Sequence, residues 1–170
     1  MRHAARGLVI VIVCAVAVMA QGAKQPIEGV WKVSEIVVTG AGASTVSSPQ
    51  PGLFIFTRSH YSIMYVPGSE ARALKKAETA TADEKIAAYD SFLANAGTYQ
   101  RAGSTLTIRP IVARDPNYMV GGFNKYQLRI DGNTLTLTNN STDLNMRFGD
   151  RVVASNAPTS QTRMKLVRLE

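Results

Sequence analysis

The sequence predicts an all-β protein: an eight-stranded antiparallel up-and-down barrel with one helical insert after the third strand. Three observations predict this fold. Short segments that alternate apolar and polar residues recur between residues 30 and 169, separated by turns containing glycine, proline or asparagine. Only residues 69–96 interrupt them, with a composition rich in the helix formers alanine, lysine and glutamate. A meander of eight or nine such strands is best accommodated by a closed barrel, because closure leaves no exposed sheet edge.

Residues 1–20 are predicted to be an export signal. A short basic head precedes an uncharged apolar run, Leu8 to Val18, and Val18-Met19-Ala20 offers residues that signal peptidase accepts. The run is shorter than the roughly 20 apolar residues of a permanent membrane-spanning helix. We therefore expect an exported, periplasmic or secreted protein that is cleaved after Ala20, with Ala23 as the second choice and an uncleaved anchor as the alternative.

Charge and cysteine content exclude several function classes. Removing residues 1–20 takes Arg2 and Arg6 from the 19 basic residues, which leaves 17 against 12 acidic ones. Cys14 is the only cysteine and lies in the signal, so the domain at 27–169 has no disulfide, thiolate ligand or cysteine nucleophile. The basic residues lack interleaved aromatic residues, so nucleic acid is not an expected partner. Peripheral contact with an anionic envelope surface stays open, because basic residues are more frequent near the C-terminus.

Three strands are predicted before the helical insert. Residues 30–38 are rich in β-branched side chains and lead into 39–51, whose glycine, serine and proline content predicts a long open loop. Residues 53–57 and 60–66 form a predicted hairpin around Arg58-Ser59. In its second strand Tyr61, Ile63 and Tyr65 share one face of the sheet.

The insert contains one predicted helix over about 83–95 and a weaker helical pattern over about 69–79. Thr81-Ala82-Asp83-Glu84 has the pattern of a helix start, with Thr81 or Asp83 as the cap. Asn95 and Gly97 are typical of a helix end. In a barrel this helix could lie across the open mouth as a lid, with Tyr89 and Phe92 facing inward.

The remaining strands follow at short intervals. Asp131-Gly132 is one of the strongest two-residue hairpin signals, and it joins the predicted strands 123–130 and 134–139. In the first of these strands Tyr126, Leu128 and Ile130 share a face. Gly121-Gly122 is typical of a turn or bulge rather than a phosphate-binding loop. The predicted strands after the insert are 97–101, 105–112, 123–130, 134–139, a less regular 146–153, and 161–169.

An ordered set of motifs resembles the bacterial and fungal lipocalin-like domain family of calycin-type barrels. The resemblance covers about residues 27–169 and is carried by Gly29-Val30-Trp31, Phe54-Ile55-Phe56, Ala96-Gly97-Thr98-Tyr99, Pro116-Asn117-Tyr118 with Gly121, and Ile130-Asp131-Gly132-Asn133-Thr134-Leu135-Thr136-Leu137. It implies a barrel without a defined activity. It also implies structural roles for Gly29 and Trp31, with Arg168 stacking on the tryptophan at the closed end.

Two segments depart from the pattern of the relatives. Relatives often carry a histidine where this chain has Ile108-Arg109-Pro110, and an arginine early in the strand that here begins Phe123-Asn124-Lys125-Tyr126. If those polar groups face the lumen in relatives, this protein binds something different.

Candidate site residues are aromatic rather than catalytic. Tyrosine combines apolar area with one hydrogen-bonding tip, which suits a lumen that holds a mostly apolar ligand. The expected ligand-binding residues are therefore Tyr61, Tyr65, Phe92, Tyr126 and Leu128; the alternative is that these rings only pack the barrel. His60, the one histidine after the signal, lies beside a turn, and the spacing of histidine and cysteine predicts no zinc site, catalytic set or cofactor.

These observations predict a protein that binds a small apolar or amphipathic molecule in the barrel without transforming it. Two alternatives stay open. One is an enzyme, such as an isomerase, cyclase or hydrolase, that uses the same cavity with tyrosine or aspartate as acid or base. The other is a structural envelope module whose barrel is filled by its own side chains.

Overall fold

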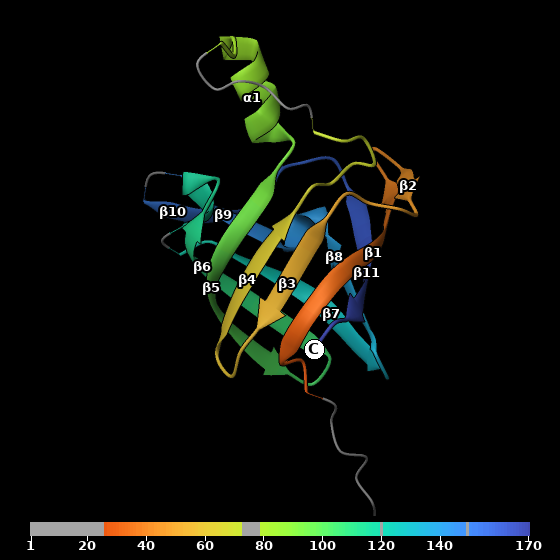
Figure 1. Ribbon diagram of the computed structural model, residues 1–170. Helices are drawn as coiled ribbons and strands as arrows, with labels where there is room; N and C mark the ends of the chain where they lie inside the picture. Colours follow the sequence, from red (N-terminus) through yellow and green to blue (C-terminus); the bar gives the residue numbers. More distant parts are fainter. Residues whose placement is uncertain (1–25, 73–78, 120, 149) are drawn as a thin grey trace, which may run out of the picture.

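Eight strands form a closed antiparallel barrel in the computed structural model, which describes residues 26–72, 79–119, 121–148 and 150–170 (Figure 1). Each strand of the ring pairs with its neighbours in chain order, and the pairing of β7 with β8 completes the closure. This confirms the predicted barrel and its up-and-down order. The ring consists of β1 (Gly29–Gly40), β3 (Gly52–Phe56), β4 (His60–Tyr65), β5 (Leu93–Ala102), β6 (Thr105–Ala113), β7 (Phe123–Asp131), β8 (Thr134–Asn140) and β11 (Ser160–Arg168).

Three short strands lie outside this ring. β2 (Ser44–Val46) pairs with β1, so part of the segment expected to be an open loop extends the sheet. β9 (Leu144–Phe148) and β10 (Arg151–Ala154) form a hairpin that joins the barrel where Phe123 of β7 pairs with Asn145. The sequence predicted a single strand over 146–153; the chain reverses inside it, since Phe148 pairs with Arg151.

The helix α1 (Ala82–Asp90) lies between β4 and β5 and projects beyond one end of the barrel (Figure 1). Thr81 caps it: its hydroxyl accepts from the Glu84 amide at 3.2 Å, and the Glu84 carboxylate accepts from the Thr81 amide at 3.0 Å. The helix is shorter than predicted, because residues 93–95 pair with β4 and β6 as the start of β5. The helical pattern over 69–79 falls largely outside the described residues.

The interior of the barrel follows the two-residue alternation of the strands. Side chains that point inward are buried, and the largest fully buried ones are Trp31, Phe54, Leu106, Ile108, Leu135, Leu137, Met164 and Leu166. Their neighbours along each strand are half-buried or exposed on the outer wall. The alternation predicted from the sequence is therefore the pattern that builds the core.

A bulge in β6, opposite Ala96 and Gly97 of β5, brings two backbones into close contact. The register between β5 and β6 shifts between Ala96 and Gly97, so Ile111 of β6 has no partner in the ladder. A Cβ atom at Gly97 would overlap the Arg109 carbonyl oxygen and lie 2.7 Å from the Pro110 Cα. Only glycine fits there, and the extra residue Ile111 moves the inward face of β6 from Pro110 to Ala113, which pairs with Asn95.

None of the helices in the described part of the chain is both long enough and apolar enough to cross a bilayer. Residues 1–25, which contain the predicted export signal, are not among the described residues.

Candidate functional site

Six polar side chains gather inside the barrel. They come from β4, β5, β7 and the short helix η1 (Pro116–Tyr118), and we call them the lumen polar cluster: Tyr61, Tyr65, Asn95, Tyr118, Asn124 and Tyr126. Five of them are buried; Tyr65 is half-buried at the edge of the group. Asn95 and Asn124 are the only buried polar side chains besides tyrosine in the described residues.

Strand alternation places five members of the cluster. Tyr61 and Tyr65 flank Ile63 on the inward face of β4, and Asn95 of β5 pairs with Ile63 in register. Asn124 and Tyr126 point inward from β7 together with Leu128, and their exposed fractions are 6%, 9% and 5%. The cluster is therefore built on three strands of the ring rather than on loops.

Tyr118 reaches the cluster from η1. Asp115 caps this helix, because its carboxylate accepts from the Asn117 amide at 2.9 Å. Gly122 then lets the chain pass directly beside Tyr118, since a Cβ atom at Gly122 would overlap the Tyr118 carbonyl oxygen. The glycine pair predicted to be a turn thus positions a buried tyrosine that is only 8% exposed.

Four side-chain polar atoms of the cluster are buried without a protein partner in the described part of the chain. The Asn124 amide donates to the Tyr126 hydroxyl at 3.0 Å. Within the described residues, no side chain or backbone group hydrogen-bonds to these four buried atoms: Tyr61 Oη, Tyr118 Oη, Asn95 Oδ1 and Asn124 Oδ1. A buried polar atom without a hydrogen bond costs about 1–3 kcal/mol, and proteins rarely keep several together.

The tyrosines of the cluster influence one another electrostatically. Burial raises the pKa of Tyr61, and it raises the pKa of Tyr65 to about 12, with the Arg114 guanidinium acting in the opposite direction. Burial also raises the pKa values of Tyr118 and Tyr126, and the neighbouring tyrosines raise both further. All four hydroxyl groups are therefore protonated and uncharged at neutral pH.

Arg114 lies at the rim of this site and connects it to α1. Its Nη1 donates to the Tyr89 carbonyl at 2.7 Å and to the Asp90 carbonyl at 3.2 Å. The guanidinium carbon lies 4.7 Å from the centroid of the Tyr89 ring, and the Tyr89 hydroxyl donates to the Arg114 carbonyl at 2.7 Å. Its Nε is buried and unpaired within the described chain.

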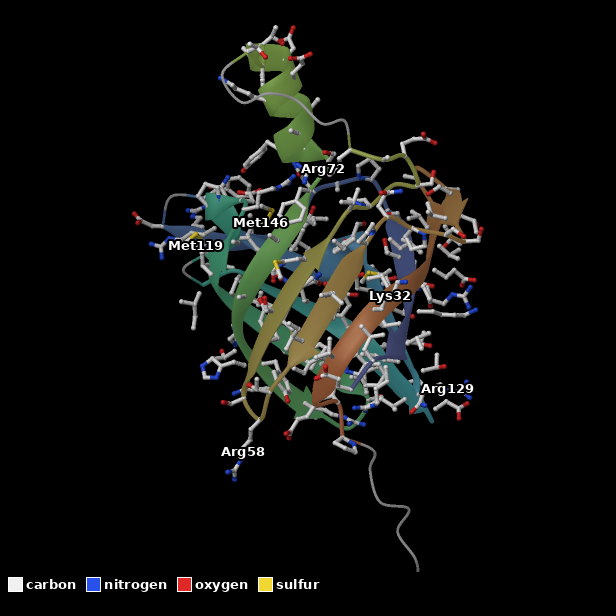
Figure 2. All side chains as sticks on the ribbon, viewed as in Figure 1. Lys32, Arg58, Arg72, Met119, Arg129 and Met146 are labelled. Atoms are coloured by element: carbon white, nitrogen blue, oxygen red, sulfur yellow. The ribbon has the colours of Figure 1, made fainter. Side chains whose placement is uncertain are left out.

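The structure brings together four of the five ligand-binding residues expected from the sequence. Tyr61, Tyr65, Tyr126 and Leu128 face one another across the lumen. Phe92 does not join them: it lies between α1 and β5, where the Arg72 guanidinium is 5.1 Å from its ring centroid. Figure 2 shows Arg72 at the base of α1 and Arg58 at the opposite end of the barrel.

The expectation that α1 forms a lid with Tyr89 and Phe92 facing inward is wrong for this structure. The helix buries no residue, and Tyr89 is 49% exposed. The physical reason is that the helix lacks an apolar stripe long enough to cover the mouth, so only its C-terminal end contacts the barrel, through the arginines at 72 and 114.

Sequence reasoning missed four residues of the site: Asn95, Tyr118, Asn124 and Arg114. Asn95 was interpreted as a helix stop. Asn124 carried a usable signal, because it precedes Tyr126, Leu128 and Ile130 at two-residue spacing and therefore had to face inward if they did. Nothing in the sequence indicates the position of Arg114, which depends on where α1 ends.

The three residues expected at the closed end form one contact network. The Arg168 guanidinium carbon lies 4.1 Å from the centroid of the Trp31 ring, and Trp31 Nε1 donates to the Ile27 carbonyl at 2.8 Å. Gly29 has φ +133°, and a Cβ atom there would lie 2.6 Å from Arg168 Nη1. This end of the barrel is thus closed by side chains that leave no space for a ligand.

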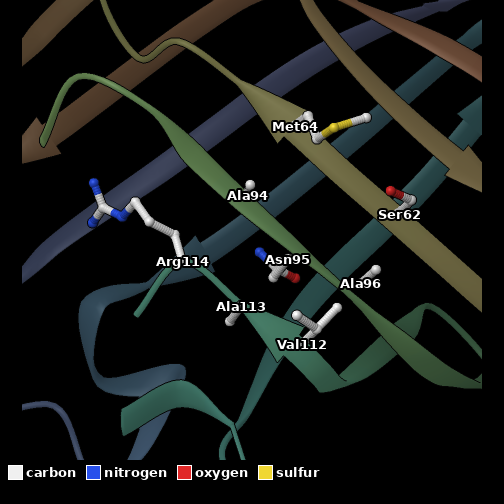
Figure 3. A pocket seen from close by; sticks show the side chains of 8 residues that line it. All are labelled: Ser62, Met64, Ala94, Asn95, Ala96, Val112, Ala113 and Arg114. Carbon is white, nitrogen blue, oxygen red and sulfur yellow. The ribbon is translucent and has the colours of Figure 1, made fainter. Parts of the chain in front are cut away.

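A shallow groove of about 310 Å³ lies on the outer wall over β4, β5 and β6 (Figure 3). Its floor is formed by Ala94 and Ala96, and its sides by the exposed residues Met64 and Val112. Asn95, a member of the lumen polar cluster, also lines this groove, so the groove and the cluster meet at β5.

Comparison with known protein families gives one match. The model of a family described as a lipocalin-like domain matches residues 28–156, which span most of the barrel. The chain belongs to the lipocalin-like domain family. No curated protein and no solved structure matches it. A lipocalin-like barrel supports the binding of a small molecule in general.

No group of three or more histidine, cysteine, aspartate or glutamate side chains in the described ranges is arranged to hold a metal ion.

Proposed function

We propose that this lipocalin-like protein is an exported carrier that binds one small, mostly apolar or amphipathic molecule inside its barrel, against the lumen polar cluster. The observation that carries this proposal is the set of four unpaired polar atoms on Tyr61, Asn95, Tyr118 and Asn124. Each reduces the stability of the folded chain unless a partner satisfies it. A ligand that hydrogen-bonds to them recovers this cost on binding.

A barrel filled only by its own side chains explains the cluster poorly. Phenylalanine at 61 and 118, and leucine at 95 and 124, would fill similar volumes without unpaired atoms. The closed end of the same barrel shows what a filled core looks like, because Trp31, Phe54 and Leu166 are completely buried there. The concentration of unpaired polar side chains in the lumen polar cluster supports binding instead.

The protonation state of the cluster favours binding over acid–base catalysis. A general base at neutral pH must be able to lose its proton there, and burial raises the pKa values of Tyr61, Tyr65, Tyr118 and Tyr126 above the ordinary value of 10.0. These hydroxyl groups act as hydrogen-bond donors and acceptors.

Export rests on the sequence of residues 1–20, which has a basic head, an apolar run and residues suited to cleavage after Ala20. A domain without cysteine folds equally in reducing and oxidising compartments.

The second expected partner, an anionic envelope surface, gains no support from the basic residues near the C-terminus. Glu35 lies 3.4 Å from Arg163 and 3.2 Å from Lys165, so one carboxylate offsets part of that positive charge.

Binding of the neutral fluorescent probe N-phenyl-1-naphthylamine tests the proposal. We expect its emission to rise with the purified protein, and Leu128→Trp to abolish this rise because indole occupies the space beside Tyr126. Lys125→Ala, on the outer face of the same strand, is the matched control and leaves binding unchanged. Thermal melting establishes that both variants fold.

The outer groove is tested in the same assay. Val112→Ser removes one of its apolar sides without touching the lumen. Binding that survives Leu128→Trp and is lost with Val112→Ser would move the site to the outer wall and refute the proposal.

A further inference from the structure

The hydrogen-bonding pattern of the lumen polar cluster points to a class of ligand; this inference rests on the proposed function. We infer that the part of the ligand inside the cluster is uncharged and donates hydrogen bonds, as an alcohol, a phenol or a primary amide does. A carboxylate, a phosphate or an ammonium group is excluded from this position.

The unpaired atoms require a donor. Asn95 and Asn124 each present an amide oxygen, which only accepts hydrogen bonds. In the orientation that the structure shows, Asn124 Nδ2 donates to the Tyr126 hydroxyl, so the amide oxygen is the end that has no partner. The hydroxyls of Tyr61 and Tyr118 either donate or accept. A hydroxyl group, or a primary amide with its NH₂ donors and its carbonyl acceptor, satisfies both kinds of atom.

The electrostatic surroundings exclude a charge. No lysine, arginine, histidine, aspartate or glutamate is buried in the described parts of the chain, so nothing inside the barrel can act as a counter-ion. Transfer of an unpaired ion from water into such a site costs far more free energy than hydrogen bonds from the tyrosine hydroxyl groups recover. Burial likewise opposes ionisation of the cluster's own hydroxyl groups.

Arg114 is the cation closest to this site, and its position defines the rival hypothesis. It lies at the rim, where it lowers the pKa of Tyr65 while its Nη1 is bonded to the Tyr89 and Asp90 carbonyls. An anionic group attracted by Arg114 would therefore be held at the rim and not among Tyr61, Asn124 and Tyr118.

Four probes with the same ring system and different polar groups distinguish these hypotheses: naphthalene, 2-naphthol, 2-naphthamide and 2-naphthoate. At pH 7 we expect 2-naphthol and 2-naphthamide to bind at least about tenfold more tightly than the other two, which corresponds to one or two hydrogen bonds. Calorimetric titration of the purified protein measures all four dissociation constants.

Variants that remove the unpaired hydroxyl groups give a second readout. In the double variant Tyr61→Phe, Tyr118→Phe we expect the dissociation constant of 2-naphthol to rise about tenfold while the melting temperature stays equal or increases. A purely structural role for these hydroxyls predicts a lower melting temperature instead. Tyr99→Phe is the matched control: its hydroxyl donates to the Thr57 carbonyl at 2.7 Å, so this variant melts earlier and keeps its affinity for 2-naphthol.

The outcomes separate the inference from the proposed function. Equal or tighter binding of 2-naphthoate overturns the inference and leaves the carrier function intact, and its loss in Arg114→Met would assign the anion to the rim. Equal binding of all four probes, naphthalene included, also overturns the inference, because the polar cluster then selects nothing. Failure of all four to bind, together with a lower melting temperature of the double variant, refutes the proposed function itself.

Discussion

Arg168 and Trp31 join the two ends of the described chain at the closed end of the barrel. The guanidinium carbon lies 4.1 Å from the indole centroid, and the same guanidinium donates to the carbonyls of Pro26 at 2.9 Å and Glu28 at 2.6 Å. One side chain of the last strand thus holds the segment that leads into the first strand. The planar, forked geometry of arginine is required for stacking and for two separate acceptors.

Replacement of Arg168 by lysine is expected to destabilise the barrel. Lysine retains the charge but loses the stacking and at least one hydrogen bond, so we expect the free energy of unfolding to fall by about 1–3 kcal/mol. Denaturant unfolding measures the change. Arg129→Lys is the control, because the Arg129 side chain is 79% exposed beside Asp131 and its replacement changes stability little. Equal effects of the two substitutions would contradict the role of Arg168.

Gly29→Ala is expected to disrupt the same contact. Gly29 has φ +133°, and a Cβ atom would overlap the Glu170 carbonyl oxygen and lie 2.6 Å from Arg168 Nη1. Gly42→Ala provides the comparison: Gly42 also has a positive φ, +72°, but no atom lies within 4 Å of the added Cβ. Both variants have backbone strain of about 1–2 kcal/mol, so a larger drop in melting temperature for Gly29→Ala measures the overlap. An equal drop would show that strain alone accounts for the glycine.

The sequence was sufficient for the barrel and insufficient for the chemistry of its lumen. Alternation identified the inward faces of β4 and β7, and the Asp131-Gly132 turn identified one hairpin, because both signals act over a few neighbouring residues. The β9–β10 hairpin and the bulge opposite Ala96 and Gly97 depend on contacts between distant segments, and they were not predicted. The position of Asn95 was not predicted either. It faces the lumen because residues 93–95 pair with β4 as the start of β5, where the sequence predicted the end of a helix.

The sequence placed three tyrosines of the lumen polar cluster inside the barrel but did not place its two asparagines there. Tyr61, Tyr65 and Tyr126 share strand faces with apolar residues, and this local pattern is enough to place them inside. The pairing of Asn124 with Tyr126 follows the same rule and was within reach of it. The contribution of Tyr118 depends on Gly122 and on the turn of η1, which no periodicity indicates.

Arg114→Met is expected to release α1 from the barrel while the barrel stays folded. The substitution removes the hydrogen bonds to the Tyr89 and Asp90 carbonyls and the stacking on the Tyr89 ring. Since α1 buries no residue, few other contacts hold it. We expect hydrogen exchange of amides 85–91 to accelerate at least about tenfold, with a melting temperature within a few degrees of the parent protein. Unchanged exchange in that segment would show that Arg72, which donates to the Ala88 carbonyl at 2.8 Å, is sufficient.

The stability of the barrel is expected to fall steeply above pH 10. In the unfolded chain tyrosine ionises with a pKa of 10.0, whereas burial raises the pKa of Tyr65 to about 12 and raises those of Tyr61, Tyr118 and Tyr126 as well. Between pH 10 and pH 12 the unfolded state therefore binds fewer protons than the folded state, so the free energy of unfolding decreases as pH rises. Each of these tyrosines contributes up to about 1.4 kcal/mol per pH unit.

Alkaline titration provides the measurement, with phenolate absorbance and near-ultraviolet circular dichroism recorded together. We expect the phenolate signals of the lumen polar cluster to develop in the same pH interval in which the tertiary signal is lost, because these tyrosines ionise only when the barrel opens. The variant Tyr65→Phe removes one titrating group, so the slope of stability against pH becomes shallower by about one proton. The contrary outcome is that all six tyrosines ionise near pH 10 while the barrel keeps its tertiary signal. This would show that water reaches the cluster freely. The argument that charged ligands are excluded electrostatically would then lose its physical basis.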